Sequence, residues 1–413
     1  SSNNNKIADF GPTEIVFNED GDDVDFRVEG DTKANLFVVD AGNDKITLDG
    51  DLEPTTINGI TFPTAGALSN RNLIINGAMT VAQRGTSATG VTSSGYYSVD
   101  RMSIGLSSLG TYTMTQESDG PAGFSKSFKI DCTTADSSPA ASNFFKLDYN
   151  IEGQDLQHLD YGASTAKPLT LTFYVKSNKT GNASLEIQQK DNSDRQITPQ
   201  YTISAANTWE KKTISVPADA SGLINDDNGT GLRITWWLNS GSAYQGGSHQ
   251  TTWVAESNSD RNVSNLGIGG STSDYFQITG IQLEVGEKAT PFEHRSYGDE
   301  INRCYRYCQR YGGGRIAMGI WVNNAGGDRV LVNHHLHTPM RATPAIDAVT
   351  NGNVLVEDVA WYSVTSAPTI QGESNPRMAV FTCITSTTGV VTADGQTPAV
   401  WGNGADVTLE AEL

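Results

Sequence analysis

The chain has 413 residues, of which 37% are apolar and 18% are charged, and it contains 42 glycines. Its 47 acidic and 28 basic residues give a net charge of −19, and no cluster of Lys and Arg offers the phosphate neutralisation that nucleic-acid binding needs. No apolar run approaches the ~20 residues that span a bilayer. We therefore expect neither a nucleic-acid partner nor insertion into a membrane.

Residues 1–70 are predicted to form an acidic segment of short strands that ends in an extended linker. Apolar runs such as Ile15–Phe17 and Ile46–Leu48 alternate with turns rich in Asp, Asn and Gly. Residues 1–51 carry 13 acidic and 4 basic side chains, about half of the net charge. Strands this short cannot bury a core alone, so we expect this segment to need a partner, most simply other copies of the chain.

Residues 71–296 are predicted to form a larger antiparallel β domain. Its strand candidates alternate apolar and polar residues, as is typical of a sheet with one wet face. The number and spacing of these runs indicate a two-sheet sandwich. Clear examples are "SFKIDC", "LTLTFYVKS", "GLRITWWLNS" and "YFQITGIQLEVG".

Three aromatic residues of this domain are candidates for sugar binding, namely Trp253, Tyr244 and Trp236. Flat aromatic faces can stack on the C–H groups of sugars, and neighbouring Asn, Asp and Gln side chains can supply hydrogen bonds. Packing in the core or in an interface is the alternative explanation for each of them. Trp236 and Trp237 are adjacent in a strand, so only one of the two faces the core.

Residues 297–314 are predicted to form one connecting amphipathic helix. Acidic residues occur at its start and "GGG" at its end. Its apolar stripe would pack against the sandwich or against the same helix of other copies. The residues of this predicted packing stripe are Ile301, Cys304, Tyr305 and Cys308.

Cys304 and Cys308 could also belong to a metal site or a redox pair. The other two cysteines are isolated in sequence, which leaves a metal site short of ligands, and an i, i+4 disulfide on one helix has poor geometry. Buried thiols that pack as small hydrophobic groups are the favoured explanation.

Residues 315–413 return to strand patterns and are predicted to form a C-terminal β domain. Its "NHHLH" run is the best candidate metal site, because His335 and His337 would point to the same face of a strand. Three copies around a threefold axis would supply six nitrogens. The alternative is an ordinary polar sheet edge.

Catalysis has little support, since no G-x-S-x-G, H-E-x-x-H or P-loop pattern is present. We expect a non-enzymatic protein without a cofactor.

Several stretches carry a resemblance to a known class of proteins. "NLIINGAMTVAQRGTS" (72–87), "YYSVDRMSIG" (96–105) and "FQITGIQLEVGEKATPFEHRSYGDEINRCYRYCQRY" (276–311) resemble a module widespread in bacteriophage tail fibres and other virion surface proteins. "HTPMRATPAI" (337–346) resembles the start of the β domain that often follows it. The resemblance implies an all-β chain with a jelly-roll sandwich of the carbohydrate-binding-module type, a connecting helix, a C-terminal β domain and a homotrimer. The acidic opening segment is similar to strand-rich repeats of marine and cyanobacterial phage structural proteins.

The resemblance leads us to expect a structural phage protein made in the host cytoplasm and located on the virion surface. It would form a trimeric fibre or spike that contacts the host envelope or its glycans, with residues 1–70 bound to other capsid or tail proteins. One alternative is a capsid decoration or cement protein on the major capsid protein. A second alternative is a polysaccharide-degrading tailspike.

Overall fold

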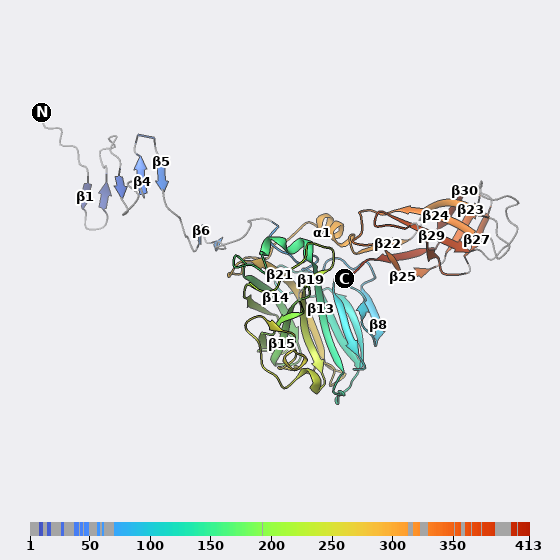
Figure 1. Cartoon of the computed structure of the whole chain (residues 1–413), viewed down its shortest axis with the longest axis horizontal. Coiled ribbons are helices and arrows are strands. Elements are labelled where there is room, and N and C mark those ends of the chain that lie inside the picture. The colour runs from blue at the N-terminus through green and yellow to red at the C-terminus, as the bar shows by residue number, and fades with distance from the viewer. Residues whose placement is uncertain are drawn as a thin grey trace. The chain divides into compact units, whose positions relative to one another are not determined.

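The computed structural model confirms a nearly all-β chain (Figure 1). It describes seven short strands between residues 8 and 61, and then residues 70–413 apart from 192, 313–316, 323–328, 351, 357–359, 365, 373, 385–397 and 403. The chain divides into two compact units, residues 1–64 and 65–413. No helix within the described residues is long and apolar enough to cross a membrane.

The first unit consists of short antiparallel pairings. Its strands over 15–17, 26–28, 37–40 and 45–48 overlap the predicted runs, whereas those over 56–57 and 60–61 fall in the predicted linker. The pairs and the small sheet are β1–β2, β3–β4–β5 and β6–β7. Their bounds are β1 Ala8–Phe10, β2 Ile15–Phe17, β3 Phe26–Val28, β4 Phe37–Asp40, β5 Lys45–Leu48, β6 Thr56–Ile57 and β7 Ile60–Thr61. Phe26, Val28 and Ile46 expose 37%, 42% and 65% of their surface, so this unit leaves apolar side chains in water.

Two antiparallel sheets form the central sandwich. The six-stranded sheet has the order β18 (Glu210–Val216), β14 (Leu169–Ser177), β21 (Tyr275–Val285), β12 (Ser127–Thr134), β11 (Thr111–Glu117) and β8 (Ser87–Val91). The eight-stranded sheet has the order β20 (Val254–Ala255), β16 (Arg195–Ile197), β15 (Gly181–Gln189), β19 (Thr230–Ser240), β13 (Phe144–Glu152), β10 (Ser103–Ser107) and β9 (Gly95–Tyr96), with β17 (Gln200–Ile203) also paired to β15. Short 3-10 helices are η1 (Gly153–Leu159), η2 (Ser242–Tyr244) and η3 (Asn258–Asp260).

The core lies between these sheets because alternate residues of each strand point inward. Phe173 of β14 and Trp236 of β19 meet edge to face, with their ring centroids 5.6 Å apart. Both are fully buried, as are their apolar neighbours along the two strands. Burial of large side chains of this kind stabilises the fold by about 1.5–3 kcal/mol each.

Residues 72–77 lie along β21, more than 200 positions later in the chain. Leu73 N donates to Leu283 O at 2.9 Å, and Ile281 N donates to Gly77 O at 2.9 Å. A Cβ on Gly77 would lie 2.1 Å from Ile281 O, so the close approach of the two backbones requires glycine there. Two of the stretches that carry the phage-module resemblance therefore pack against each other.

The predicted connecting helix is too long. Helix α1 spans Tyr297–Cys304, starting after Ser296, whose Oγ accepts a hydrogen bond from Asp299 N. Cys308–Gly312 forms strand β22 instead, because β31 (Asp406–Glu410) offers it an antiparallel partner. Gly313 and Gly314, the predicted stop, lie outside the described residues.

Two further sheets form the C-terminal sandwich that the sequence predicts. Strand β31 is the centre of the order β22–β31–β25 (Ala345–Thr350). The seven-stranded sheet has the order β27 (Ala360–Ser363), β26 (Asn353–Val356), β30 (Pro398–Gly402), β23 (Ala317–Val322), β24 (Arg329–His335), β29 (Met378–Ile384) and β28 (Thr369–Ile370). Buried side chains of both sheets, among them Leu409 and Phe381, share one apolar cluster.

A buried ion-pair network joins this sandwich to the central one. Arg101 and Glu412, whose side chains are 1% and 5% exposed, pair at 2.5 Å. The Arg101 guanidinium also lies 3.4 Å from the ring centroid of Tyr307. Arg84 adds ion pairs to Glu412 and to Asp347 of β25 at 3.3 and 2.9 Å. These contacts hold the C-terminal sheets against the central sandwich, close to the residues that connect α1 to β22.

Replacing Glu412 with Gln is predicted to lower the free energy of unfolding by about 3 kcal/mol, because it leaves the buried Arg101 charge without its carboxylate. Denaturant unfolding of the full chain measures the loss. The matched control is Asp194→Asn, which breaks an exposed pair with Lys190 and should cost below about 1 kcal/mol. Equal losses in the two variants would contradict the prediction.

Candidate functional site

Trp236 is wrongly predicted as a sugar-binding residue. Its side chain is fully buried against Phe173 in the sandwich core, where no ligand face is available. The adjacent Trp237 points to the opposite side of β19, and its indole Nε1 donates to Glu186 Oε2 at 2.8 Å. Of the two neighbouring tryptophans, the predicted sugar-binding residue Trp236 is therefore the one that packs in the core.

Tyr244 belongs to a packed cluster over the outer side of the eight-stranded sheet. Its ring lies 5.1 Å from that of Trp237, which is only 1% exposed. The Arg261 guanidinium lies 5.3 Å from the Trp237 ring centroid, and its Nε lies 2.9 Å from Glu186 Oε1. The Trp237 face is therefore occupied by the protein's own side chains, and Tyr244 is half-buried beside it.

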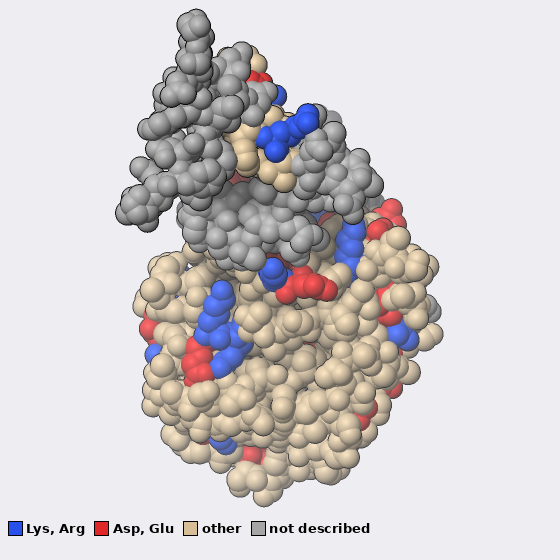
Figure 2. Space-filling view, turned by 90° about the vertical axis from the view of Figure 1, so that its left-hand side faces the viewer, with Lys and Arg blue, Asp and Glu red and all other residues tan. Residues whose placement is uncertain are grey.

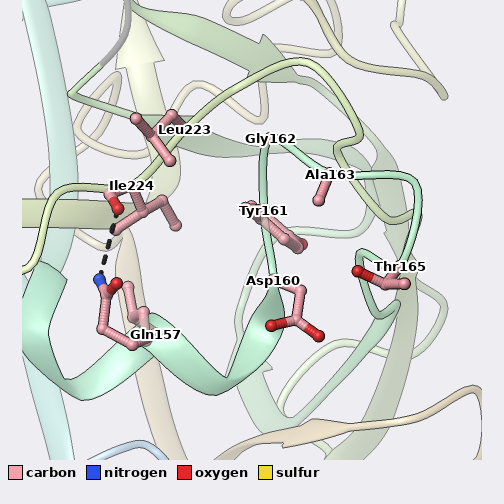
Figure 3. Close-up of a pocket in the computed structure, with 9 residues that line it drawn as sticks. Gln157, Asp160, Tyr161, Gly162, Ala163, Thr165, Leu223 and Ile224 are labelled. Atoms are coloured by element: carbon pink, nitrogen blue, oxygen red, sulfur yellow. Dashed lines mark hydrogen bonds between the residues drawn. The ribbon is translucent and has the colours of Figure 1, made fainter.

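Trp253 is half-buried, and its indole nitrogen already donates a hydrogen bond within the protein. Its Nε1 donates to Pro217 O at 2.7 Å, and its ring meets that of Tyr161 edge to face at 5.9 Å. Tyr161 lines a pocket between η1 and the loop that contains Leu223 (Figure 3). The three predicted sugar-binding residues thus lie in three separate environments.

The two candidate metal ligands do not share a strand face. β24 ends at His335, so the predicted alternation does not reach His337. The His337 ring instead lies between Tyr305 and Tyr311, 4.9 Å from each ring centroid. Within the described part of the chain, no three His, Cys, Asp or Glu side chains form a group that could hold a metal ion.

All four cysteines are free and buried. Burial raises the pKa of Cys304 and Cys308 well above the usual value, and raises that of Cys383 to about 12. At neutral pH these groups are thiols rather than the thiolates that bind metals or exchange disulfides. Cys304 and Cys308 pack beside the Arg101 network, whereas Ile301 and Tyr305 are half-buried.

An aromatic surface that the sequence did not reveal lies on the outer side of the six-stranded sheet. Tyr174 and Tyr275 point outward there, because their neighbours Phe173 and Phe276 point into the core. Loops that border the sheet add further half-exposed rings. We call this surface the aromatic strip, and its members are Phe124, Tyr174, Trp209, Tyr275 and Phe292.

One half of the aromatic strip is an apolar cluster of rings. The Phe124 ring centroid lies 5.4 Å from that of Tyr174 and 4.9 Å from that of Phe292. Beneath them, Gly280 has φ +61°, and a Cβ there would lie 2.8 Å from Phe124 and 2.9 Å from Tyr174. Glycine thus both permits the backbone turn in β21 and makes room for the rings.

The other half combines rings with hydrogen-bonding groups. Lys176 Nζ lies 2.7 Å from Asp119 Oδ2 and 5.7 Å from the Trp209 ring centroid. The hydrogen bond from Lys176 is the main reason that the pKa of Asp119 is lowered, so this carboxylate stays an acceptor. Gln277, which pairs with Lys176 across β14 and β21, donates to the same carboxylate at 3.2 Å.

Tyr275 extends the strip toward β12. Its hydroxyl donates to Asn207 Oδ1 at 2.7 Å, and Lys129 Nζ lies 5.3 Å from its ring centroid. Lys129 in turn pairs with Asp131 at 3.0 Å. Lys129 and Lys176 therefore each have an Asp next to them. The exposed Lys211, which lies opposite Tyr174 across β14 and β18, has no ion pair within the described residues.

Charged side chains elsewhere show the same balance. In Figure 2, Lys and Arg lie next to Asp and Glu in small groups on a mostly uncharged surface. A phosphate-binding surface needs an excess of Lys and Arg. Among the described residues, the face in Figure 2 shows no such excess.

Comparisons with known proteins give no family. No protein-family model matches the chain, and no curated protein matches it. Solved structures resemble about half of it at low identity. The enzymatically active domain of tailspike protein 4 from bacteriophage CBA120 is 12% identical, with a TM-score of 0.27 over 52% of this chain, which spans 21% of that domain.

Two sugar-binding proteins are also similar. A Bacteroides thetaiotaomicron protein described as sugar-binding is 14% identical, with a TM-score of 0.30 over 53% of this chain and 100% of its own. A family 11 carbohydrate-binding module of Clostridium thermocellum is 11% identical, with a TM-score of 0.22 over 52% of this chain and 96% of its own. At such values, the function has to be argued from the residues of this chain.

Replacing Gly280 with Ala is predicted to lower the free energy of unfolding by about 1–3 kcal/mol and to displace the Phe124 and Tyr174 rings. Denaturant unfolding gives the first effect and ring proton chemical shifts give the second. Gly246→Ala is the matched control, since Gly246 also has a positive φ but no neighbour within 4 Å of a Cβ. Unmoved ring signals in Gly280→Ala would contradict the proposed support.

Proposed function

We propose that the central sandwich binds glycan chains through the aromatic strip and that the protein is a non-enzymatic surface protein of a bacteriophage virion. The main support for glycan binding is a set of five half-exposed aromatic rings on one side of a sheet. Lys, Asp, Gln and Asn side chains lie between them. Exposed aromatic groups gathered in one patch, rather than scattered, mark an interaction surface.

The chemistry of the strip suits a sugar chain. Each pyranose ring has an apolar C–H face that packs on a flat aromatic ring, and hydroxyl edges that need donors and acceptors. Trp209 and Tyr275 supply the faces, while Asp119 and Lys176 supply the polar groups beside them, and the buried Gln277 holds Asp119 in place. Because Lys129 and Lys176 are each matched by a carboxylate, the polar half of the strip suits a neutral chain.

The virion assignment is supported by the phage-module motifs at 72–87 and 276–311. These segments hydrogen-bond to one another between Leu73 and Leu283. The first unit supports the homotrimer, because Phe26, Val28 and Ile46 leave apolar surface that other copies would cover. In this proposal residues 1–70 attach to other virion proteins and the sandwich faces the host envelope.

Trp209→Ala and Tyr275→Ala are each predicted to weaken binding to a host surface polysaccharide about tenfold, a loss of about 1.4 kcal/mol. A glycan array identifies the ligand, and calorimetry on the full-length chain measures the affinity. Tyr97→Ala is the control, because Tyr97 is half-exposed but lies outside the strip. Equal binding by all variants would overturn the glycan proposal, and release of reducing sugar ends would favour a degrading enzyme.

The full chain is predicted to sediment as a trimer at micromolar concentration. Replacing both Val28 and Ile46 with Ser removes the exposed apolar contacts and should shift the equilibrium toward monomer. Analytical ultracentrifugation measures both. A wild-type chain that stays monomeric would refute the homotrimer, and cryo-EM of the virion that finds the protein on the capsid would favour a decoration protein.

A further inference from the structure

We propose that the pocket between η1 and the loop around Leu223 is a second binding site, which holds one neutral sugar residue. We call it the η1 pocket (Figure 3). No part of the aromatic strip lines it, so this site stands apart from the proposed chain-binding surface.

The pocket has the size of a site for one small ring. Its volume is about 250 Å³, below the roughly 300–1,000 Å³ of pockets that enclose drug-sized molecules. A polysaccharide therefore cannot lie along it, and only a single residue or a chain end fits.

Its walls are fixed before any ligand arrives. Gln157 Nε2 donates to Ile224 O at 3.3 Å and to Asn225 O at 3.0 Å, which ties η1 to the facing loop. Gly162 has φ +89°, and a Cβ there would lie 2.9 Å from Leu223 Cα, so the two segments meet at this glycine. Preformed walls spare the ordering cost that a flexible site would pay on binding.

One side of the pocket is apolar. Leu156 and Ile224 are buried in this wall, and Leu223 is 57% exposed at the rim, an unusual position for a large aliphatic side chain. The Tyr161 ring adds an aromatic surface to the same lining. An apolar ring face placed against this wall would remove the Leu223 side chain from water.

The other side is polar and carries a negative charge. Asp160 and Thr165 contribute a carboxylate and a hydroxyl, and Figure 3 shows both side chains on the same side of the pocket. The Tyr161 hydroxyl is buried out of reach of solvent, so this residue offers the pocket its ring and not its hydroxyl.

These features together favour a neutral ligand that has one apolar face and one edge of hydroxyl groups. A sugar ring presents C–H groups on one face and hydroxyls at its edge, which matches the two walls. Lys167 Nζ lies 3.7 Å from Asp160, but no Lys or Arg lines the pocket itself. The Asp160 carboxylate therefore accepts hydrogen bonds from hydroxyls and repels the carboxylate of an acidic sugar.

Titration of the full chain with monosaccharides tests the site, using ligand-observed NMR. The probes are glucose, galactose and mannose, each as the methyl glycoside, and glucuronic and galacturonic acids as the acidic partners of the first two. Ala163→Trp fills the pocket from its exposed loop, and Ser164→Trp adds the same side chain at an exposed neighbour that does not line it. Circular dichroism verifies that both variants fold.

We expect at least one neutral sugar to bind with a millimolar Kd, about −4 kcal/mol. Ala163→Trp should weaken it at least about tenfold, Ser164→Trp less than about twofold, and the matching acid should bind about threefold more weakly. Trp209→Ala should leave it unchanged, which separates this site from the aromatic strip. The proposal is overturned if no sugar binds, if Ala163→Trp binds like the wild type, or if the acid binds more tightly.

Discussion

The buried charge of Arg101 is the constraint that joins the central sandwich to the C-terminal one. A guanidinium taken out of water needs a fixed counter-charge and fixed acceptors. These come from distant parts of the chain: the Glu412 carboxylate follows β31, the Asn150 carbonyl lies in β13, and the Tyr307 ring follows α1. A chain that did not bring β31 to the sandwich would leave this charge unpaired. The two sandwiches are therefore coupled through this network.

The two outer sides of the central sandwich have different uses. On the eight-stranded sheet, outward residues such as Glu186 and Trp237 are buried beneath residues 241–262, where they form hydrogen bonds to one another and to Arg261. On the six-stranded sheet, outward residues such as Tyr174 and Tyr275 stay half-exposed. A ring can stack on a ligand only if one of its faces is free. This difference is why we place the proposed chain-binding surface on the six-stranded sheet, although Trp237 lies on the eight-stranded one.

The strands could be predicted from sequence because their alternation is a local property. Alternation also indicates that Tyr174 opposes Phe173. In β19 it places Trp236 with the apolar Leu232 and Ile234, so the inward side of this strand could have been read from the sequence. The helix was extended too far since Cys308 and Tyr311 satisfy a helical stripe, while the competing partner β31 lies almost 100 residues later. The aromatic strip combines loops and strands, and the η1 pocket combines a 3-10 helix with loops, in each case from distant positions, so only the fold brings their residues together.

The two proposed sites solve different problems of glycan recognition. The aromatic strip is open and spreads over several strands, so successive residues of a chain can contact it without regard to where the chain ends. The η1 pocket is too small for more than one ring and discriminates by its apolar wall and by the Asp160 carboxylate. Each contact alone is weak, since a millimolar site contributes only about −4 kcal/mol. In the proposed trimer, three copies facing one envelope would act as linked sites, and linkage can raise overall avidity by about 10²–10⁴ without any new contact. Weak single sites are then an advantage, because each releases quickly while the assembly stays bound.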